Sequence, residues 1–452
     1  MKLIRVATQV HSYTAVFGAL LLVLSFSVSS TANNIEKAVE KDYDAHLGDL
    51  FTHFHRNPEL SNLETKTAER LARELEQVGF TVHKKVGGKT GIVALMHNGD
   101  GPTVMMRADM DGLPVEEKTG LKYASKAQQE DWDGNLVYTM HACGHDVHIT
   151  SLVGTARRMA AMKDQWSGTL MLIGQPAEER VLGAREMMDD DLWKRFGKPD
   201  YAMAFHVSSG VRAGKIAATD GSPYSGADTV DIIVHGIGAH GASPHAGKDP
   251  VVIGSQIVLA LQTIVSREIA PKEPSVITVG SFHSGTKHNI ISDRAHLQLT
   301  VRSDRKKTRD KLLEAIERVA VNVGRAAGMP EDKLPEVIVS DESVPPTVND
   351  KPLSNRLIAL WGDKMGSDIF DNTSENQGMG AEDFGFFTTD PYIPSHYFAV
   401  GGTPEAAFKE AAEGGTPIPS HHSPLFKILP EPAVRTGVEA TVHALLELLQ
   451  EQ

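Results

Sequence analysis

The chain has 452 residues, of which 41% are hydrophobic and 23% are charged, so it is long enough for a globular protein of two or three domains. Its 58 aspartates and glutamates outnumber its 45 lysines and arginines, which gives a net charge of -13. The sequence contains no basic run with interleaved aromatic residues, so no nucleic acid is expected as a partner.

The first 32 residues have the pattern of a secretory signal peptide. Lys2 and Arg5 precede an apolar stretch from Ala15 to Val28, and a segment of small residues that ends at Ala32 follows it. The apolar stretch is shorter than the roughly 20 residues that cross a bilayer. We therefore expect cleavage after Ala32 and an exported protein, periplasmic or secreted, that is free of the membrane. An uncleaved anchor is the alternative.

The next part of the chain alternates helical patterns with short apolar runs. From Asn34 to about Val78, apolar residues recur at three- and four-residue spacing, which predicts helix. A further helix is expected from about Val147 to Met162. Apolar runs bounded by glycine, asparagine or proline predict strands at 91–96, 103–106, 169–173 and 201–205. Such runs are typical of strands buried on both faces of a mostly parallel sheet flanked by helices, so the predicted fold class is α/β.

A different pattern begins after Gly221-Ser222-Pro223. It predicts a strand, a helix, two strands, a helix and a strand, which is the order of a ferredoxin-like unit. These elements are expected at 229–234, 250–266, 275–282, 295–302, 309–327 and 336–340. We therefore predict a catalytic domain over 33–221 and 341–452, interrupted by an inserted ferredoxin-like α+β domain over 222–340. The last part is expected to hold a helix at 353–365, a strand at 397–400 and a helix at 432–449.

The densest group of reactive side chains lies between His141 and His148. It contains three histidines, one aspartate and Cys143, which is the single cysteine of the chain, so no disulfide forms within it. A lone cysteine is usually a small buried hydrophobic residue. Here, however, Cys143 and His145 stand two apart and can face one ion, and thiolate and imidazole are ligands that zinc and similar metals prefer. We predict that this segment binds metal.

Two glutamates form a second candidate group. Glu178 and Glu179 directly follow the predicted strand at 169–173. Adjacent carboxylates repel each other, which is costly in a concave site unless a cation separates their roles. Glu179 is then a candidate metal ligand, and Glu178 is a candidate base that takes a proton from water.

Other polar residues also follow predicted strands. The loop at 107–114, which contains Asp109, follows one strand, and His206 follows another. Ligands of open α/β sheets collect at the carboxyl ends of the strands, so these groups are expected to converge with Glu178. Near the end of the chain, the segment 420–424 supplies two more imidazoles.

Five segments resemble the motifs of the hippurate hydrolase and auxin-conjugate hydrolase family, within the aminoacylase and carboxypeptidase-like dinuclear metallopeptidases. They occur in the family order at 107–114, 141–148, 176–179, 378–384 and 422–424. The resemblance implies an amidohydrolase that cleaves N-acyl amino acids, such as hippurate or acetyl- and indoleacetyl-amino acids. It also implies two divalent metal ions, zinc, manganese, cobalt or nickel, and a homodimer formed through the inserted domain.

The resemblance further implies roles for individual residues. Glu178 would be the general base and acid, Asp109 would belong to the catalytic group, and His240 would act on the active site of the partner subunit. Asn289 and Arg302 would bind the substrate carboxylate. The implied metal ligands are Cys143, in the place of a bridging aspartate in related carboxypeptidases, and His145, Glu179, His206 and His422.

The sequence departs from the family pattern in three places. Ala239 stands where a glycine is common, Ser292 replaces a proline after Ile291, and His421 adds an imidazole beside His422. These departures leave open the shape of the substrate pocket and which of the two histidines binds metal.

Three other functions compete with the amidohydrolase. An exported metallo-dipeptidase or aminopeptidase could use the same scaffold. A metal-binding protein without turnover has no need of Glu178, which supplies no required ligand. A structural or interaction protein has no need of histidine, cysteine and carboxylates at strand ends.

Overall fold

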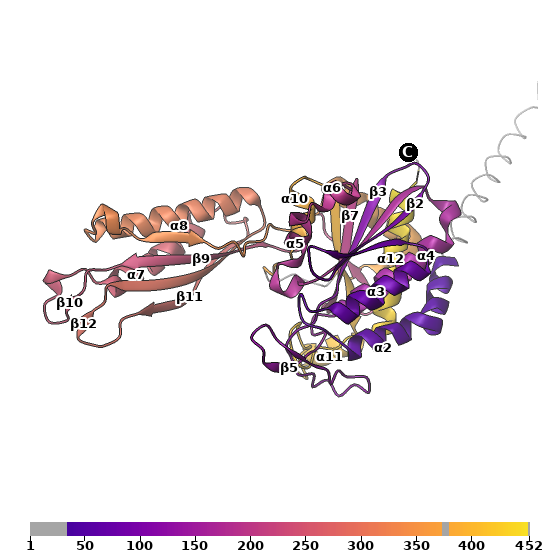
Figure 1. Ribbon diagram of the computed structural model, residues 1–452, viewed down its shortest axis with the longest axis horizontal. Coiled ribbons are helices and arrows are strands. Elements are labelled where there is room, and N and C mark those ends of the chain that lie inside the picture. Colours follow the sequence, from indigo (N-terminus) through magenta and orange to yellow (C-terminus); the bar gives the residue numbers. More distant parts are fainter. Residues whose placement is uncertain (1–33, 373–378, 451–452) are drawn as a thin grey trace, which may run out of the picture.

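The computed structural model describes residues 34–372 and 379–450, and the expected signal peptide lies outside them. Figure 1 shows a larger unit built on a broad sheet and a smaller unit that projects from it. The strands and long helices of the smaller unit lie between Gly226 and Val339, and the chain then returns to the larger unit.

The larger unit contains a seven-stranded sheet whose four central strands, β6, β3, β7 and β15, are parallel. Strands β2 and β8 are antiparallel to these, and β1 is antiparallel to β2. The predicted α/β class is confirmed, and the parallel strands end at one edge of the sheet. In sheet order the strands are β1 (Thr81–Val86), β2 (Gly91–Asn98), β6 (Gly168–Gln175), β3 (Thr103–Asp109), β7 (Tyr201–Arg212), β15 (Ser395–Thr403) and β8 (Ile216–Ala217).

Helices cover both faces of this sheet. One face packs against a helix over residues 34–42 and against α2 (Gly48–Arg56), α3 (Thr65–Gln77), α4 (His145–Ala161), α9 (Lys351–Met365) and α12 (Pro430–Leu448). The other face packs against α5 (Gly183–Asp189), α6 (Leu192–Phe196) and α10 (Gly385–Thr389). Helix α4 is buried on nearly every side because it lies between the sheet and α12.

The smaller unit is a four-stranded antiparallel sheet in the order β11-β13-β9-β14, with two helices on one face. Its core is almost purely aliphatic and joins the helices to alternate strand residues. A two-stranded ribbon of β10 (Ala239–His240) and β12 (Ile290–Ile291) forms the tip farthest from the larger unit (Figure 1). The main elements are β9 (Gly226–His235), α7 (Pro250–Thr263), β11 (Ser275–Ser284), β13 (Arg294–Ser303), α8 (Lys306–Ala326) and β14 (Glu336–Val339).

Two local features differ from the sequence pattern. The helical pattern from Asn34 to Val78 is interrupted between Asn57 and Glu64, because Pro58 disfavours helical backbone at the residue before it. Strand β1 was not predicted, because it lies at the sheet edge, where most of its residues are exposed or half-buried and two of them are lysines.

Candidate metal centre and active site

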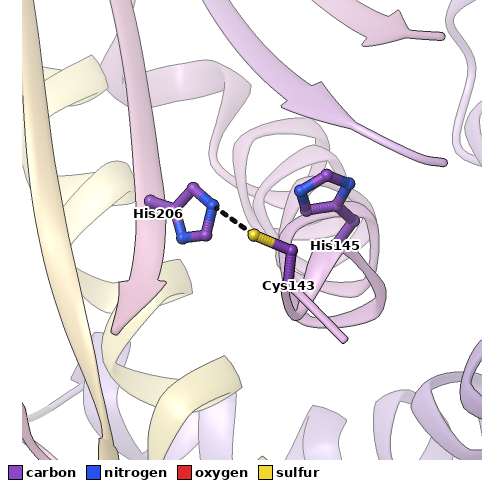
Figure 2. Close-up of side chains that lie close together, drawn as sticks. All are labelled: Cys143, His145 and His206. Atoms are coloured by element: carbon purple, nitrogen blue, oxygen red, sulfur yellow. Dashed lines mark hydrogen bonds between the residues drawn. The ribbon is translucent and has the colours of Figure 1, made fainter. Parts of the chain in front are cut away.

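The five predicted ligands come from different elements that meet at the carboxyl edge of the parallel strands. Cys143 precedes α4, His145 is the first residue of that helix, and His206 lies in β7. Figure 2 shows these three side chains pointing toward one another. Glu179 lies in the short 3-10 helix that follows β6, and His422 lies in the loop before α12.

These side chains form two overlapping groups. The first contains Cys143, His145 and His206, and the second contains Cys143, Glu179 and His422. Within each group the possible ligand atoms all lie within 4.8 Å of one another. Cys143 Sγ lies 3.4 Å from His206 Nε2, and His422 Nε2 lies 3.1 Å from Glu179 Oε2. Because Cys143 belongs to both groups, its sulfur is placed to bridge two ions.

The charges around this cluster favour cations. His145 Nε2 and Glu179 Oε1 are buried and form no hydrogen bond with any described residue. Burial opposes a charge on His145, but Asp109 and Asp111 outweigh it and raise its pKa to about 10. Burial and the carboxylates of Glu179 and Glu178 raise the pKa of the Cys143 thiol. Divalent ions would supply the missing positive charge and stabilise the thiolate, so the side chains present fit such ions.

The backbone is strained where it holds these ligands. His422 has a φ of 67°, and Ala177 and Val181, which flank the two glutamates, have φ of 50° and 52°. Left-handed backbone at non-glycine residues costs energy and collects at functional sites. Gly144 has a φ of 84°, and a Cβ there would lie 2.3 Å from Cγ1 of Val207, so only glycine fits between Cys143 and His145.

Two histidines near the cluster form hydrogen bonds with the backbone of Val207. His148 Nδ1 lies 2.5 Å from Asp109 Oδ1, and its Nε2 accepts a hydrogen bond of 2.8 Å from the backbone N–H of Val207. Both of its ring nitrogens are therefore used. His421 Nε2 donates to the carbonyl of Val207 at 3.0 Å, which leaves His422 as the residue of that pair that faces the cluster. Burial lowers the pKa of both His148 and His421 to about 3, so both are neutral.

Asp109, the last residue of β3, and Asp111, in the loop after it, lie behind His145. Its Nδ1 lies 3.3 Å from Asp111 Oδ1 and 3.8 Å from Asp109 Oδ1. Asp111 Oδ2 accepts hydrogen bonds from Ser61 Oγ at 2.7 Å and from the backbone N–H of Glu179 at 3.0 Å. Carboxylates in such positions orient ligating histidines. This geometry makes Asp109 a positioning residue, and it gives Asp111 a positioning role that was not predicted.

The comparisons with known proteins agree with this geometry. The profile described as Peptidase family M20/M25/M40 matches residues 105–414. The chain belongs to this family. It is 34% identical to hippurate hydrolase of Campylobacter jejuni, over 74% of this chain and 82% of that protein. It is also 34% identical to thermostable carboxypeptidase 2 of Saccharolobus solfataricus, over 87% of this chain and 92% of that protein.

A plant protein and a solved bacterial structure are also similar to this chain. It is 32% identical to IAA-amino acid hydrolase ILR1-like 2 of Arabidopsis thaliana, over 83% of this chain and 79% of that protein. A Bacillus subtilis structure described as a dinuclear metal-binding peptidase of the M20 family superposes with a TM-score of 0.73 at 26% identity, covering 90% of this chain and 99% of that one. The family predicted from the sequence motifs is confirmed.

Glu178 lies in the metal cluster, next to two further acidic residues. Its Oε2 lies 3.9 Å from His145 Nε2, and its side chain is buried. These acidic residues are Glu382 and Asp383. Their carboxylates accept hydrogen bonds from the N–H groups of Arg107, which is fully buried. Both lie in the resemblance segment 378–384, but no role was predicted for them because they stand more than 200 residues from Glu178 in sequence.

Three predicted residues lie outside the metal cluster. His240 and Asn289 are neighbours at the tip of the smaller unit, where Gly241 N–H donates to the Asn289 carbonyl at 2.8 Å. Arg302 lies at the other end of that unit, where it pairs with Ala227 near the start of β9. The ten-residue strand β13 that separates the two ends spans about 33 Å. Within one chain, the fold therefore does not bring His240 and Asn289 to the cluster.

Proposed function

We propose that this M20-family hydrolase cleaves the amide bond of N-acyl amino acids with the help of two divalent metal ions. The observation that carries the proposal is Cys143, which is shared by two groups of possible ligands, with the carboxylate of Glu178 beside them. Relatives named hippurate hydrolase, IAA-amino acid hydrolase and N-acetyl-L-cysteine deacetylase support this substrate class.

Glu178 is the residue placed to move protons. The two ions would polarise the amide carbonyl and make water more acidic when bound. A carboxylate oxygen of Glu178 then takes a proton from the attacking water and delivers it to the nitrogen of the leaving amine. Burial, together with Glu382 and Glu179, raises the pKa of Glu178 well above its usual value.

The smaller unit would bind the substrate and complete the site of a second subunit. Arg302 presents a guanidinium suited to the substrate carboxylate. His240 is exposed and would donate a hydrogen bond to the developing oxyanion across the subunit interface, with Asn289 beside it. The distance between the tip and the cluster of the same chain supports an arrangement in trans.

Helix α7 supports a homodimer through the smaller unit. The helical segment Pro250–Glu268 is, within the described residues, the one helix long and apolar enough to cross a membrane, yet only a third of it is buried. It packs on the four-stranded sheet, and its side chains Val251, Val252 and Leu259 are 44%, 53% and 72% exposed. We propose that a second copy of the chain covers this face.

We also propose that the protein is exported and acts outside the cytoplasm. The support is the signal-like pattern of residues 1–32. Labelling intact cells with a membrane-impermeant reagent and determining the mature amino terminus test this proposal.

A substrate panel tests the reaction. Purified protein, loaded in turn with zinc, manganese, cobalt or nickel, is incubated with acetyl-, benzoyl- and indoleacetyl-amino acids and with free dipeptides. We expect release of the amino acid from the acylated substrates. Cleavage of the dipeptides alone would instead favour the peptidase, in line with the relatives named carboxypeptidase.

Subunit exchange tests the action of His240 in trans. Inactive Glu178→Gln protein is mixed with inactive His240→Ala protein under conditions in which mass measurement shows exchange. A mixed dimer contains one site with both residues intact, so activity should return. Exchange without recovery would show that His240 does not act across the interface.

A further inference from the structure

An arginine lies on a tryptophan at the rim of the metal cluster. The guanidinium carbon of Arg180 is 4.4 Å from the centre of the Trp132 ring. Trp132 belongs to the hairpin of β4 (Gln128–Glu130) and β5 (Leu136–Tyr138), and the residue is 43% exposed. Figure 1 shows this hairpin below the sheet of the larger unit. Arg180 is exposed as well, so the pair faces solvent.

Short contacts tie this pair to the metal cluster. Arg180 directly follows Glu179 in a 3-10 turn that begins at Glu178, and the backbone N–H of Val181 closes the turn on the Glu178 carbonyl at 2.7 Å. Trp132 Nε1 donates to the carbonyl of Ser61 at 3.0 Å. The hydroxyl of Ser61 in turn binds Asp111, the carboxylate behind His145. One rigid turn therefore holds the base, a ligand and Arg180.

The charge of Arg180 has no partner among the described residues. Within residues 34–372 and 379–450, no carboxylate lies within 4 Å of its guanidinium, although most arginines there form such pairs. Stacking on an indole fixes the guanidinium plane but leaves its N–H groups in that plane free for a bidentate acceptor. A guanidinium already held in place loses little conformational freedom when it binds an anion.

We propose that Arg180 and Trp132 form a subsite for a carboxylate on the acyl group of the substrate. The proposal rests on the proposed amidohydrolase function and narrows it to N-acyl amino acids with a dicarboxylic acyl group, such as succinyl. The carboxylate of the amino-acid part is already assigned to Arg302 of the smaller unit. Arg180 belongs to the larger unit, on the turn that holds Glu178, so it serves the other end of the scissile amide.

The test compares two substrates that differ in one group. N-succinyl- and N-butyryl-amino acids of the same amino acid have a carboxylate and a methyl group at the same position. We expect the wild type to have the higher kcat/KM for the succinyl substrate, and Arg180→Gln to lower the succinyl-to-butyryl ratio about tenfold, as loss of a charge-assisted hydrogen bond does. Arg180→Lys should give an intermediate ratio, because it keeps the charge without the planar fork.

Arg195 provides a matched control. Its guanidinium lies 4.8 Å from the ring of Phe196 in α6, away from the cluster, so Arg195→Gln should leave the ratio unchanged. An Arg180→Gln variant that loses activity equally on both substrates, or that changes its oligomeric mass, would overturn the subsite while the amidohydrolase function stands. Failure of the wild type to cleave any acylated substrate would overturn the proposed function, and the subsite with it.

Discussion

The two units of this molecule are built in opposite ways. The larger unit buries charge: Arg107, Asp109 and Glu382 are at most 1% exposed. It also bends the backbone of His422 into the left-handed region. The smaller unit has an aliphatic core, and its buried charge Asp228 is paired with Arg309. Catalytic groups lower the stability of the domain that holds them, and here that domain is the unit with the larger hydrophobic core.

The smaller unit differs again in where its polar residues lie. His240, in β10, and Asn289, next to β12, lie at its tip, whereas the metal cluster is enclosed by elements of the larger unit. Under the proposed function, one unit would perform the chemistry, and the other would position groups that complete the site of a second subunit. Changes in the larger unit should act on the chemical step or on metal content, and changes in the smaller unit should act through assembly.

The largest effect is expected from Glu178. We predict that Glu178→Gln lowers kcat about 10⁴-fold, the upper part of the range for losing a general base, while metal content stays near normal. Glu179→Gln, one residue later in the same turn, should lose metal as well as activity. Metal analysis and steady-state kinetics on both variants check this contrast. Equal metal loss in both would show that Glu178 is also a ligand.

Cys143 should affect the metal before the chemistry. Because its sulfur belongs to both ligand groups, Cys143→Ala should weaken metal binding more than about 100-fold. Even the mutation of a residue that only supports a metal ligand typically lowers metal affinity about 10- to 100-fold. Activity should fall with metal occupancy. His421→Ala serves as the control and should keep its metal, because that imidazole binds the carbonyl of Val207. A Cys143→Ala protein with full metal would make the cysteine a packing residue.

The sequence predicts the chemistry of the site better than its geometry. Cys143, His145 and Glu178 could be found because each stands beside a second reactive residue or after an apolar strand. Glu382 and Asp383 could not be given a role, because their contacts with Arg107 depend on how a distant loop packs against β3. The choice between His421 and His422 depended on one left-handed residue, which periodicity does not reveal. Strand β1 at the sheet edge was missed because its exposed lysines hide the apolar signal.

The next smaller effect should come from the exposed face of α7, which we propose is covered by a second copy of the chain. We predict that Leu259→Glu makes the protein monomeric and lowers kcat about 10²- to 10³-fold, the usual cost of losing an oxyanion donor, with metal content unchanged. Val339→Lys, on the edge strand β14 at the other side of the sheet from β11, should remain dimeric and active. Light scattering and kinetics on both variants check this. A fully active Leu259→Glu monomer would remove the need for a partner's His240.

The smallest effect is a pH dependence of stability within the larger unit. His55, at the end of α2, is buried between two carboxylates, with Nδ1 2.7 Å from Asp146 Oδ2 and Nε2 3.3 Å from Glu117 Oε1. Burial opposes its charge, but the hydrogen bonds that its ring N–H groups donate to Asp146 and Glu117 outweigh burial and raise its pKa to about 9.

Because the folded pKa of His55 lies above the unfolded value of about 6.5, its contribution is complete below pH 6.5 and is lost as the pH rises to about 9. The shift corresponds to at most about 3 kcal/mol of the free energy of unfolding. Urea unfolding of His55→Gln should therefore show a deficit of up to that size at pH 6 that shrinks toward pH 9.5. The exposed His97→Gln should follow the wild type throughout. If His55→Gln is equally destabilised at pH 6 and at pH 9.5, packing and not charge accounts for the contribution of His55.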